Sequence, residues 1–220
     1  MNDPRVIDLR ADPDADLSAV AAALRDGGAV AYPTETVYGL GGSCTPAGVA
    51  RVRALKGRSS GKPLIALVAS EEQVASLAWT DPARELASIF WPGALTLILP
   101  DPGHVFPEGV RDADTGAVGV RISPHPTVAR LLGALGGPLT STSLNLPGEP
   151  EARTFDEAVT VVRRLEADDV WMLNGGTLPP SAPSTVVDCT APEPVVLREG
   201  SVPLSRLRCA IPEIHGNESE

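Results

Sequence analysis

Two lysines stand close together in a chain whose other cations are arginines. Lys56 and Lys62 are the two lysines among 18 basic residues, and Arg58 lies between them. A compact ammonium group binds phosphate as a point charge, while the planar guanidinium of arginine adds paired hydrogen bonds to an oxyanion. The segment therefore indicates either a phosphate site or a solvated turn after a helix, and other parts of the chain must decide between the two.

Hydroxyl and amide side chains stand at the ends of three apolar segments that have the pattern of β-strands. Strand ends that open into loops are common ligand positions in α/β proteins, although hydroxyls in turns often bond only to local backbone. Three such groups in one chain favour a shared polar pocket over isolated turns. The side chains concerned are Thr34, Ser141, Ser143, Asn145 and Ser184.

Two arginines also follow apolar strands directly. Arg121 and Arg198 each come after a run of apolar, largely β-branched residues. A single arginine is usually a surface charge, but these two add to the three cations within residues 56–62. Cations and hydroxyls gathered in one pocket would suit a nucleoside triphosphate and a small carboxylate bound together.

The elements that must position these side chains follow from alternating apolar and helical patterns. Glycine-rich residues 33–42 are expected to form a loop, and Thr154 with Glu157 has the spacing of a helix capping box. The last strands have no helices between them, so the chain predicts an α/β fold with a mixed sheet and packed helices. Strands are expected at 6–9, 29–32, 64–68, 95–99, 117–121, 139–143, 171–173, 185–187 and 194–197, and helices at 17–25, 45–56, 81–90, 127–132 and 154–165.

The acidic balance of the chain argues against a surface that binds nucleic acid along its whole extent. The 220 residues carry a formal net charge of −10, whereas nucleic-acid binding needs a basic face. Local cations in such a chain are better suited to a small anionic ligand. We expect one domain over residues 1–203, a partly disordered tail over 204–220, and a cytoplasmic protein, since no apolar run approaches the roughly 20 residues of a membrane span.

The chain lacks the motifs of several familiar mechanisms. It has no Gly-x-x-x-x-Gly-Lys-Ser/Thr loop and no Gly-x-Ser-x-Gly elbow. Its three cysteines and three histidines lack metal-ligand spacing, so any metal is expected to arrive with a substrate. Glu35 is a candidate general base or a group that orients backbone, and a structural loop carboxylate is an equally good interpretation. A mechanism of positioning and charge neutralisation, with the substrate as its own nucleophile, fits best.

Six short motifs resemble, in order and in spacing, the motif series of the YrdC family. They occupy residues 33–40, 56–58, 91–96, 119–121, 141–145 and 184–188, and the resemblance spans about residues 19–200. It implies a twisted, largely open α/β sheet with a concave, positively charged ligand cavity. It also implies synthesis of L-threonylcarbamoyladenylate from L-threonine, bicarbonate and ATP, with release of pyrophosphate, for modification of the tRNA adenosine next to the anticodon.

The same resemblance implies roles for individual residues. No residue would be a covalent nucleophile, Mg²⁺ would travel with ATP, and the product would pass to the threonylcarbamoyl-transferase machinery that acts on tRNA. Lys56 and Arg58 would stabilise the charge of the leaving pyrophosphate. L-Threonine would be held by Thr34, Arg121, Ser141 and Ser184, and ATP by Lys56, Arg58, Lys62, Ser143, Asn145 and Arg198.

Three positions depart from the pattern of many family members. Lys62 stands where many carry an amide that faces ATP, and Leu67 stands where many carry a histidine near threonine. Leu144 gives the motif at 141–148 a form that is similar to a YciO-like branch. The motifs at 33–36 and 56–58 are intact, which favours the synthase.

Two other functions stay open on the sequence. One is a non-catalytic RNA- or ribosome-binding module of the YciO-like type, for which the acidic balance and the two tyrosines provide no obvious stacking platform, so any RNA binding is expected to be weak. The other is carbamoyl adenylation, as in the related domain of hydrogenase maturation proteins. This chain has no room for the zinc-finger and acylphosphatase parts of those proteins.

Overall fold

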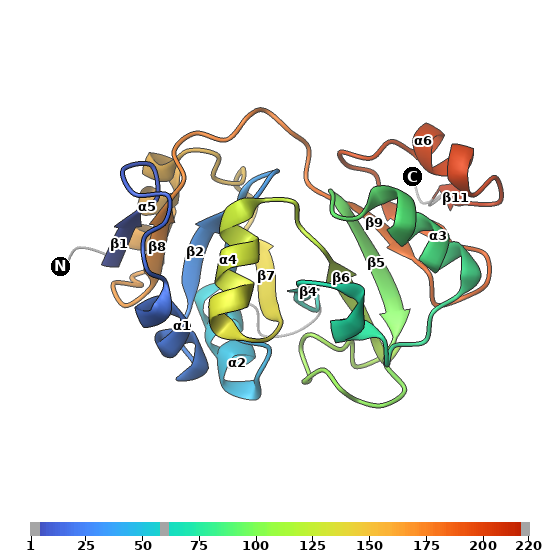
Figure 1. The fold of residues 1–220 in the computed structure, drawn as a ribbon, viewed down its shortest axis with the longest axis horizontal. Coiled ribbons are helices and arrows are strands. Elements are labelled where there is room, and N and C mark those ends of the chain that lie inside the picture. Colours follow the sequence, from blue (N-terminus) through green and yellow to red (C-terminus); the bar gives the residue numbers. More distant parts are fainter. Residues whose placement is uncertain (1–4, 58–61, 217–220) are drawn as a thin grey trace.

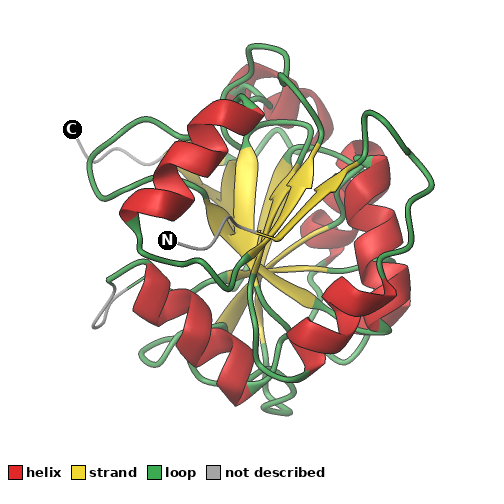
Figure 2. Ribbon diagram, turned by 90° about the vertical axis from the view of Figure 1, so that its left-hand side faces the viewer, coloured by secondary structure: helices red, strands yellow, loops and turns green. Residues whose placement is uncertain are grey.

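The computed structural model describes residues 5–57 and 62–216, in which the strands form one mixed sheet. Figure 1 shows the sheet running across the whole molecule with helices packed on it, and Figure 2 shows the strand directions fanning out along its length. The expected twisted and open mixed sheet is confirmed. In their order across the sheet, the strands are β1 (Arg5–Asp8), β8 (Trp171–Asn174), β2 (Val30–Pro33), β3 (Tyr38–Gly41), β7 (Leu139–Ser143), β4 (Ile65–Leu67), β6 (Ala117–Arg121), β5 (Leu95–Pro100), β9 (Thr185–Asp188), β10 (Val195–Arg198) and β11 (His215–Gly216).

Four of the helices within the described residues begin where the sequence provides a capping side chain. Thr154 accepts a hydrogen bond from the backbone of Glu157 while the Glu157 side chain accepts one from the backbone of Thr154, which confirms the capping box. The side chain of Thr45 accepts a hydrogen bond from the backbone N–H of Gly48, and a proline follows Thr45 at the start of its helix. The helices are α1 (Ser18–Arg25), α2 (Pro46–Leu55), η1 (Glu71–Val74, a 3₁₀ helix), α3 (Asp81–Phe90), α4 (Pro126–Leu135), α5 (Phe155–Arg164) and α6 (Leu204–Ala210).

The glycine-rich segment after β2 is not a loop throughout, which corrects the expectation for residues 33–42. Tyr38–Gly41 forms β3, which pairs with β2 and β7 in antiparallel fashion. Glycine has a low strand propensity, so the segment resembles a loop in sequence. The glycines are needed because neighbours come close: a Cβ atom at Gly39 would lie 3.0 Å from the ring of Tyr32, and one at Gly41 would collide with the carbonyl oxygen of Thr140.

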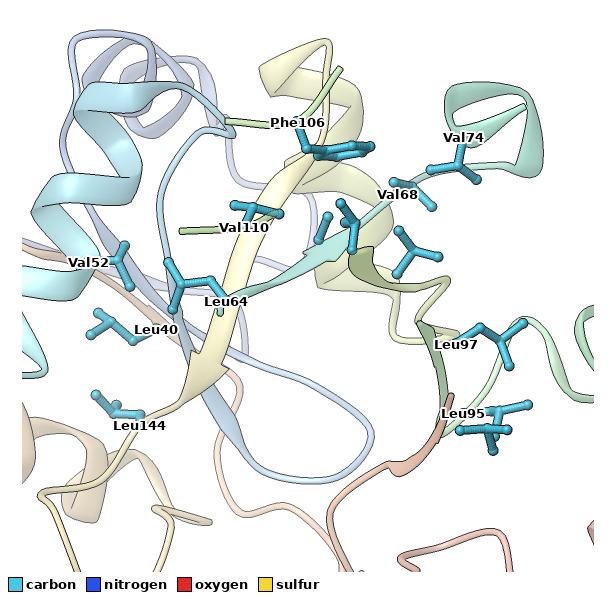
Figure 3. Close-up of a cluster of buried hydrophobic side chains, with 14 of the residues drawn as sticks. Leu40, Val52, Leu64, Val68, Val74, Leu95, Leu97, Phe106, Val110 and Leu144 are labelled. Carbon is cyan, nitrogen blue, oxygen red and sulfur yellow. The ribbon is translucent and has the colours of Figure 1, made fainter. Parts of the chain in front are cut away.

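Two groups of buried apolar side chains hold the helices to the sheet. The smaller group joins α1 and α4 to β2 and β7. The larger group extends under the remaining helices, and Figure 3 shows part of it, from Leu40 and Val52 on one side to Leu95 and Leu97 on the other. Burial of this apolar surface provides the main driving force for the fold.

The C-terminal segment is ordered structure over most of its length. We expected a tail over residues 204–220, but the structure places Leu204–Ala210 in α6 and His215–Gly216 in β11 at the edge of the sheet. Helix α6 packs against α3, and Leu207 is fully buried. Residues 204–216 are therefore part of the folded domain, and Leu207, Ile211 and Ile214 anchor them in its core.

Candidate ligand-binding site

A polar cavity of about 200 Å³ opens at the centre of the sheet. Seven of the ten residues predicted to bind ligands line it together, although they come from segments far apart in the sequence. Lys56 and Asn145 lie just behind the wall, and Arg58 lies outside the described residues. The seven lining residues are Thr34, Lys62, Arg121, Ser141, Ser143, Ser184 and Arg198.

The pairing of short strands brings these residues to one place. Strand β4 lies between β7 and β6, so Ile65 pairs with Ser141 while Leu67 pairs with Arg121. On the other side of β7, Ser143 pairs with Gly39 in β3. Side chains alternate between the two faces of a strand, so Ser141 and Ser143 project to the same face. The cavity is therefore a product of strand register.

Arg121 provides a buried positive charge at the end of β6. It is 5% exposed, its Nε atom donates a hydrogen bond of 3.1 Å to the carbonyl oxygen of Gly93, and its Nη2 atom forms an ion pair with Glu35. Burial lowers the pKa of Arg121 to about 10, so the guanidinium stays charged at neutral pH. A buried guanidinium on a cavity wall is suited to a carboxylate ligand.

Ser141 is prepared to donate a hydrogen bond into the cavity. The hydroxyl of Tyr32, which is fully buried, donates to Oγ of Ser141 at 2.8 Å. Burial raises the pKa of Tyr32 above its ordinary value, so this tyrosine stays protonated and remains the donor. Because Oγ of Ser141 already accepts this hydrogen bond, its own hydrogen is free for an acceptor on a ligand.

Thr34 uses its hydroxyl within the turn that follows β2. Its Oγ1 atom donates to the carbonyl oxygen of Val37 at 2.7 Å and accepts from the backbone N–H groups of Thr36 and Val37, each at 3.2 Å. Thr34 therefore shapes the cavity wall and fixes the turn. Thr36, which also lines the cavity and which the sequence did not single out, has its Oγ1 atom 3.1 Å from Oγ1 of Thr34.

Ser184 and Arg198 contact each other across β9 and β10. The guanidinium of Arg198 donates from Nε and Nη2 to the carbonyl oxygen of Ser184, at 3.2 and 2.9 Å. Burial lowers the pKa of Arg198, while the nearby carboxylate of Glu151 acts in the opposite direction. The hydroxyl of Ser184 lies 3.0 Å from that of Thr96. Ser184, which was predicted to bind threonine, and Arg198, which was predicted to bind ATP, are thus neighbours. Two ligands that react with each other need such neighbouring binding residues.

Lys56 organises the loop after β7. It is 4% exposed, and its Nζ atom donates to the carbonyl oxygens of Ser143 and Asn145 at 3.0 and 2.6 Å and to Oδ1 of Asn145 at 2.8 Å. The hydroxyl of Ser143 also donates to Oδ1 of Asn145 at 2.9 Å. Lys56 therefore places a positive charge behind the cavity wall and fixes two residues that were predicted to contact ATP.

A second, less polar groove of about 430 Å³ continues from the cavity. The cavity and the groove share the lining residues Lys62, Pro63, Ile65 and Arg198. The positively charged side chains of Lys62 and Arg198 therefore lie where the cavity meets the groove. The floor of the groove contains the small residues Ala117 and Gly119. Side chains from every second position of the neighbouring strands project from the same face of the sheet and complete the walls of the groove. A ligand with an apolar ring at one end and anionic groups at the other would match this arrangement.

Two of the departures from the family pattern lie in the protein core. Leu67 is 1% exposed and packs with the apolar group under α1 and α4, and Leu144 is fully buried. Neither lines the cavity. Lys62, in contrast, is exposed and lines both the cavity and the groove, so its predicted contact with ATP stays a prediction.

Two other classes of site are not found in the part of the chain that the structure describes. No group of three or more His, Cys, Asp or Glu side chains there could hold a metal ion. Within residues 5–57 and 62–216, no helix combines the length and the apolar character needed to cross a membrane.

Known proteins share both the sequence and the fold. A relative from Bacillus subtilis named threonylcarbamoyl-AMP synthase is 35% identical over 214 residues, which cover 96% of this chain and 60% of the relative. A relative of the same name from Chromohalobacter salexigens is 38% identical over 184 residues, covering 80% of this chain and 94% of the relative. The crystal structure of P. abyssi Sua5 complexed with L-threonine matches with a TM-score of 0.82 at 34% identity, covering 91% of this chain and 58% of that chain.

The chain spans about 60% of the length of the B. subtilis relative, whereas it spans nearly all of the shorter C. salexigens relative. The family model Sua5_yciO_yrdC, described as telomere recombination, matches residues 22–200. This range contains all six of the motifs that carried the resemblance. With a model match over most of its length and relatives above 30% identity, this chain belongs to the Sua5/YciO/YrdC family.

Proposed function

We propose that this protein synthesises L-threonylcarbamoyladenylate from L-threonine, bicarbonate and ATP, with release of pyrophosphate. The observation that carries the proposal is the junction of the polar cavity and the groove at Lys62 and Arg198. Two relatives named threonylcarbamoyl-AMP synthase and the Sua5 complex with L-threonine support it. The cavity would receive the amino acid, and the groove the nucleoside end of ATP.

The amino-acid end of the cavity is suited to a zwitterion. The guanidinium of Arg121 would pair with the carboxylate of threonine, and the free hydrogen of Ser141 would bond to a substrate oxygen. Thr36 and Ser184 add hydroxyls to the same wall. Threonine held in this way would present its amine to a bicarbonate or carbon dioxide carbon.

The chemistry then follows without a covalent enzyme intermediate. The threonine ammonium first gives up a proton to solvent. The neutral amine nitrogen then forms a bond to the carbon of carbon dioxide, with loss of a second proton, or to the carbon of bicarbonate, with loss of water, and gives a carbamate. A carbamate oxygen next bonds to the α-phosphorus of ATP while the bond to the bridging oxygen breaks and pyrophosphate leaves. Holding both substrates in one continuous space raises their effective concentration and aligns the attack.

Positive charges at the junction would stabilise the developing pyrophosphate. Arg198 and Lys62 line the shared part of the site, and Lys56 places its charge behind Ser143 and Asn145. Mg²⁺ bound to the triphosphate would supply further charge neutralisation. The product is a reactive mixed anhydride, so we propose that it passes to transferase machinery that modifies a tRNA adenosine.

The direct test is pyrophosphate release. The protein is incubated with Mg²⁺-ATP, bicarbonate and each amino acid in turn, and release that depends on L-threonine is the expected result. Omission of bicarbonate is the control, and it should abolish the release. Tight RNA binding without release in any mixture would instead favour the non-catalytic RNA-binding alternative.

A further inference from the structure

The carboxylate of Glu35 is held from two sides, next to the cavity but not on its wall. Its Oε1 atom forms an ion pair with Nη2 of Arg121, and its Oε2 atom accepts a hydrogen bond of 2.6 Å from Oγ of Ser123. Oγ of Ser123 in turn accepts the backbone N–H of His125 at 3.2 Å, just before α4. Glu35 is therefore fixed both to the end of β6 and to the start of α4.

The same contacts orient Arg121. Its Nε atom is fixed by the carbonyl oxygen of Gly93 and its Nη2 atom by Glu35, and neither Gly93 nor Glu35 lines the cavity. Among the described residues, Oε1 of Glu35 and Nη2 of Arg121 have no partner other than each other. The third nitrogen, Nη1, makes no hydrogen bond to any described residue. Two nitrogens are thus anchored behind the wall, and Nη1 is left for a ligand.

The ion pair also sets the charge of the site before a ligand binds. The side chains of Arg121 and Glu35 are 6% and 20% exposed, so little water screens them. A buried cation without a partner would be costly and would attract any small anion. With Glu35 in place this pair is neutral overall, and the remaining charges on the cavity wall, among the described residues, are those of Lys62, Arg198 and Glu151. Neutralising Arg121 lowers the positive charge that the amino-acid end presents to phosphate or pyrophosphate, whereas a zwitterionic amino acid brings no net charge.

We propose that Glu35 is a positioning residue that orients Arg121 for the carboxylate of the amino acid and, by neutralising it, excludes small inorganic anions from the Arg121 end of the cavity. The inference rests on the proposed function, since it concerns how the same cavity selects its amino-acid substrate. It is relevant to turnover, because the proposed reaction releases pyrophosphate beside the amino-acid site.

Four variants test the proposal. Glu35→Gln keeps the shape of the side chain and removes its charge, and Glu35→Asp keeps the charge on a shorter chain. Ser123→Ala keeps both charges and removes only the hydrogen bond to Oε2, which covers the possibility that Glu35→Gln does not fold. Asp169→Asn is the matched control, because it removes a carboxylate from the exposed ion pair with Arg51.

The measurements are calorimetric binding of L-threonine and of inorganic phosphate without ATP, and the KM values for threonine and ATP. For Glu35→Gln we expect the dissociation constant and KM for threonine to rise at least about tenfold, with the KM for ATP changed less than about twofold. We also expect inorganic phosphate to compete with threonine in this variant alone. Glu35→Asp should recover part of the threonine affinity, Ser123→Ala should lose about two- to fivefold, and Asp169→Asn should match the wild-type protein.

The outcomes separate this inference from the proposed function. If another amino acid drives pyrophosphate release, the proposed function is wrong, and the same variants measured with that amino acid still decide the role of Glu35. A folded Glu35→Gln protein that binds amino acid normally and gains no phosphate affinity overturns the inference. If Glu35→Gln is unfolded, unchanged threonine binding by Ser123→Ala overturns it.

Discussion

The Nζ atom of Lys56 lies 2.8 Å from Oδ1 of Asn145 and also donates to the backbone oxygens of Ser143 and Asn145. Three oxygen acceptors at and just after the end of β7 thus lie within hydrogen-bond distance of the ammonium. In the structure, the lysine that suggested direct phosphate binding in the sequence shapes the loop around the proposed triphosphate site, and its predicted contact with ATP stays a prediction. Its charge is still close enough to the cavity to favour an anion.

Replacement of Lys56 tests this organising role. Lys56→Met keeps much of the apolar length but leaves the acceptors of Ser143 and Asn145 without their donor. We expect the free energy of unfolding to fall by about 1–3 kcal/mol and the KM for ATP to rise more than the KM for threonine. Chemical denaturation and steady-state kinetics measure the two effects. An unchanged KM for ATP in a folded variant would contradict the role.

Removal of the Tyr32 hydroxyl should disturb the amino-acid end of the cavity. Tyr32→Phe keeps the ring in its buried position but removes the donor to Ser141. Oγ of Ser141 can then turn its hydrogen away from the ligand, so we expect threonine affinity to fall about three- to tenfold and stability by about 1 kcal/mol. Isothermal titration calorimetry with L-threonine measures the loss of threonine affinity. Equal losses in threonine and ATP binding would indicate general damage instead.

A larger side chain on the floor of the groove should block binding of ATP while leaving binding of threonine unaffected. A Cβ atom at Gly119 would lie 3.2 Å from Cγ2 of Ile65 and 3.5 Å from Cγ2 of Thr96, and the added methyls of Gly119→Val would narrow the groove further. We expect the KM for ATP to rise at least about tenfold while calorimetric threonine binding stays within about twofold. Gly133→Ala is the control, because a Cβ atom there meets nothing within 4 Å. That change should stabilise the protein by about 0.5–1 kcal/mol.

His125 should make stability depend on pH below neutrality. Its Nδ1 atom accepts the N–H of Thr127 at the start of α4, and burial lowers the pKa of His125 below the ordinary histidine value of about 6.5. The unfolded chain therefore binds a proton more readily, so this contribution is fully present above about pH 6.5 and is lost as the pH falls through the lower folded-state pKa. His125→Asn retains a capping oxygen and should flatten the dependence of Tm on pH between about pH 5 and 7. An equal slope of Tm against pH in the wild-type and His125→Asn proteins would show that other groups cause the pH dependence.

The C-terminal helix should contribute to stability as a core element does. Leu207 in α6 is fully buried and belongs to the larger apolar group. We expect Leu207→Ala to lower the free energy of unfolding by about 2–5 kcal/mol, as for other buried leucines. Exposed Leu197 is the comparison, since Leu197→Ala should cost well under 1 kcal/mol. A negligible effect at Leu207 would show that α6 is not part of the cooperative fold.

The sequence by itself determined the family, the order of most elements and the polar residues that gather at the site. A continuous apolar run located β6, and a helical repeat of apolar residues located α5, whose start is marked by Thr154. Seven of the ten predicted ligand residues line one cavity because strand ends that carry hydroxyls and cations recur in the motifs. These features depend on neighbours within a few residues.

Only the tertiary structure decided what each polar group does. Tyr38–Gly41 is a strand because β2 and β7 approach on both sides, and α6 is ordered because α3 covers it. Lys56 contacts Asn145 and Glu35 contacts Arg121 across 89 and 86 positions of the chain, respectively. No local pattern encodes such pairs, because hydrogen bonds and ion pairs depend on distances in space that the strand register sets.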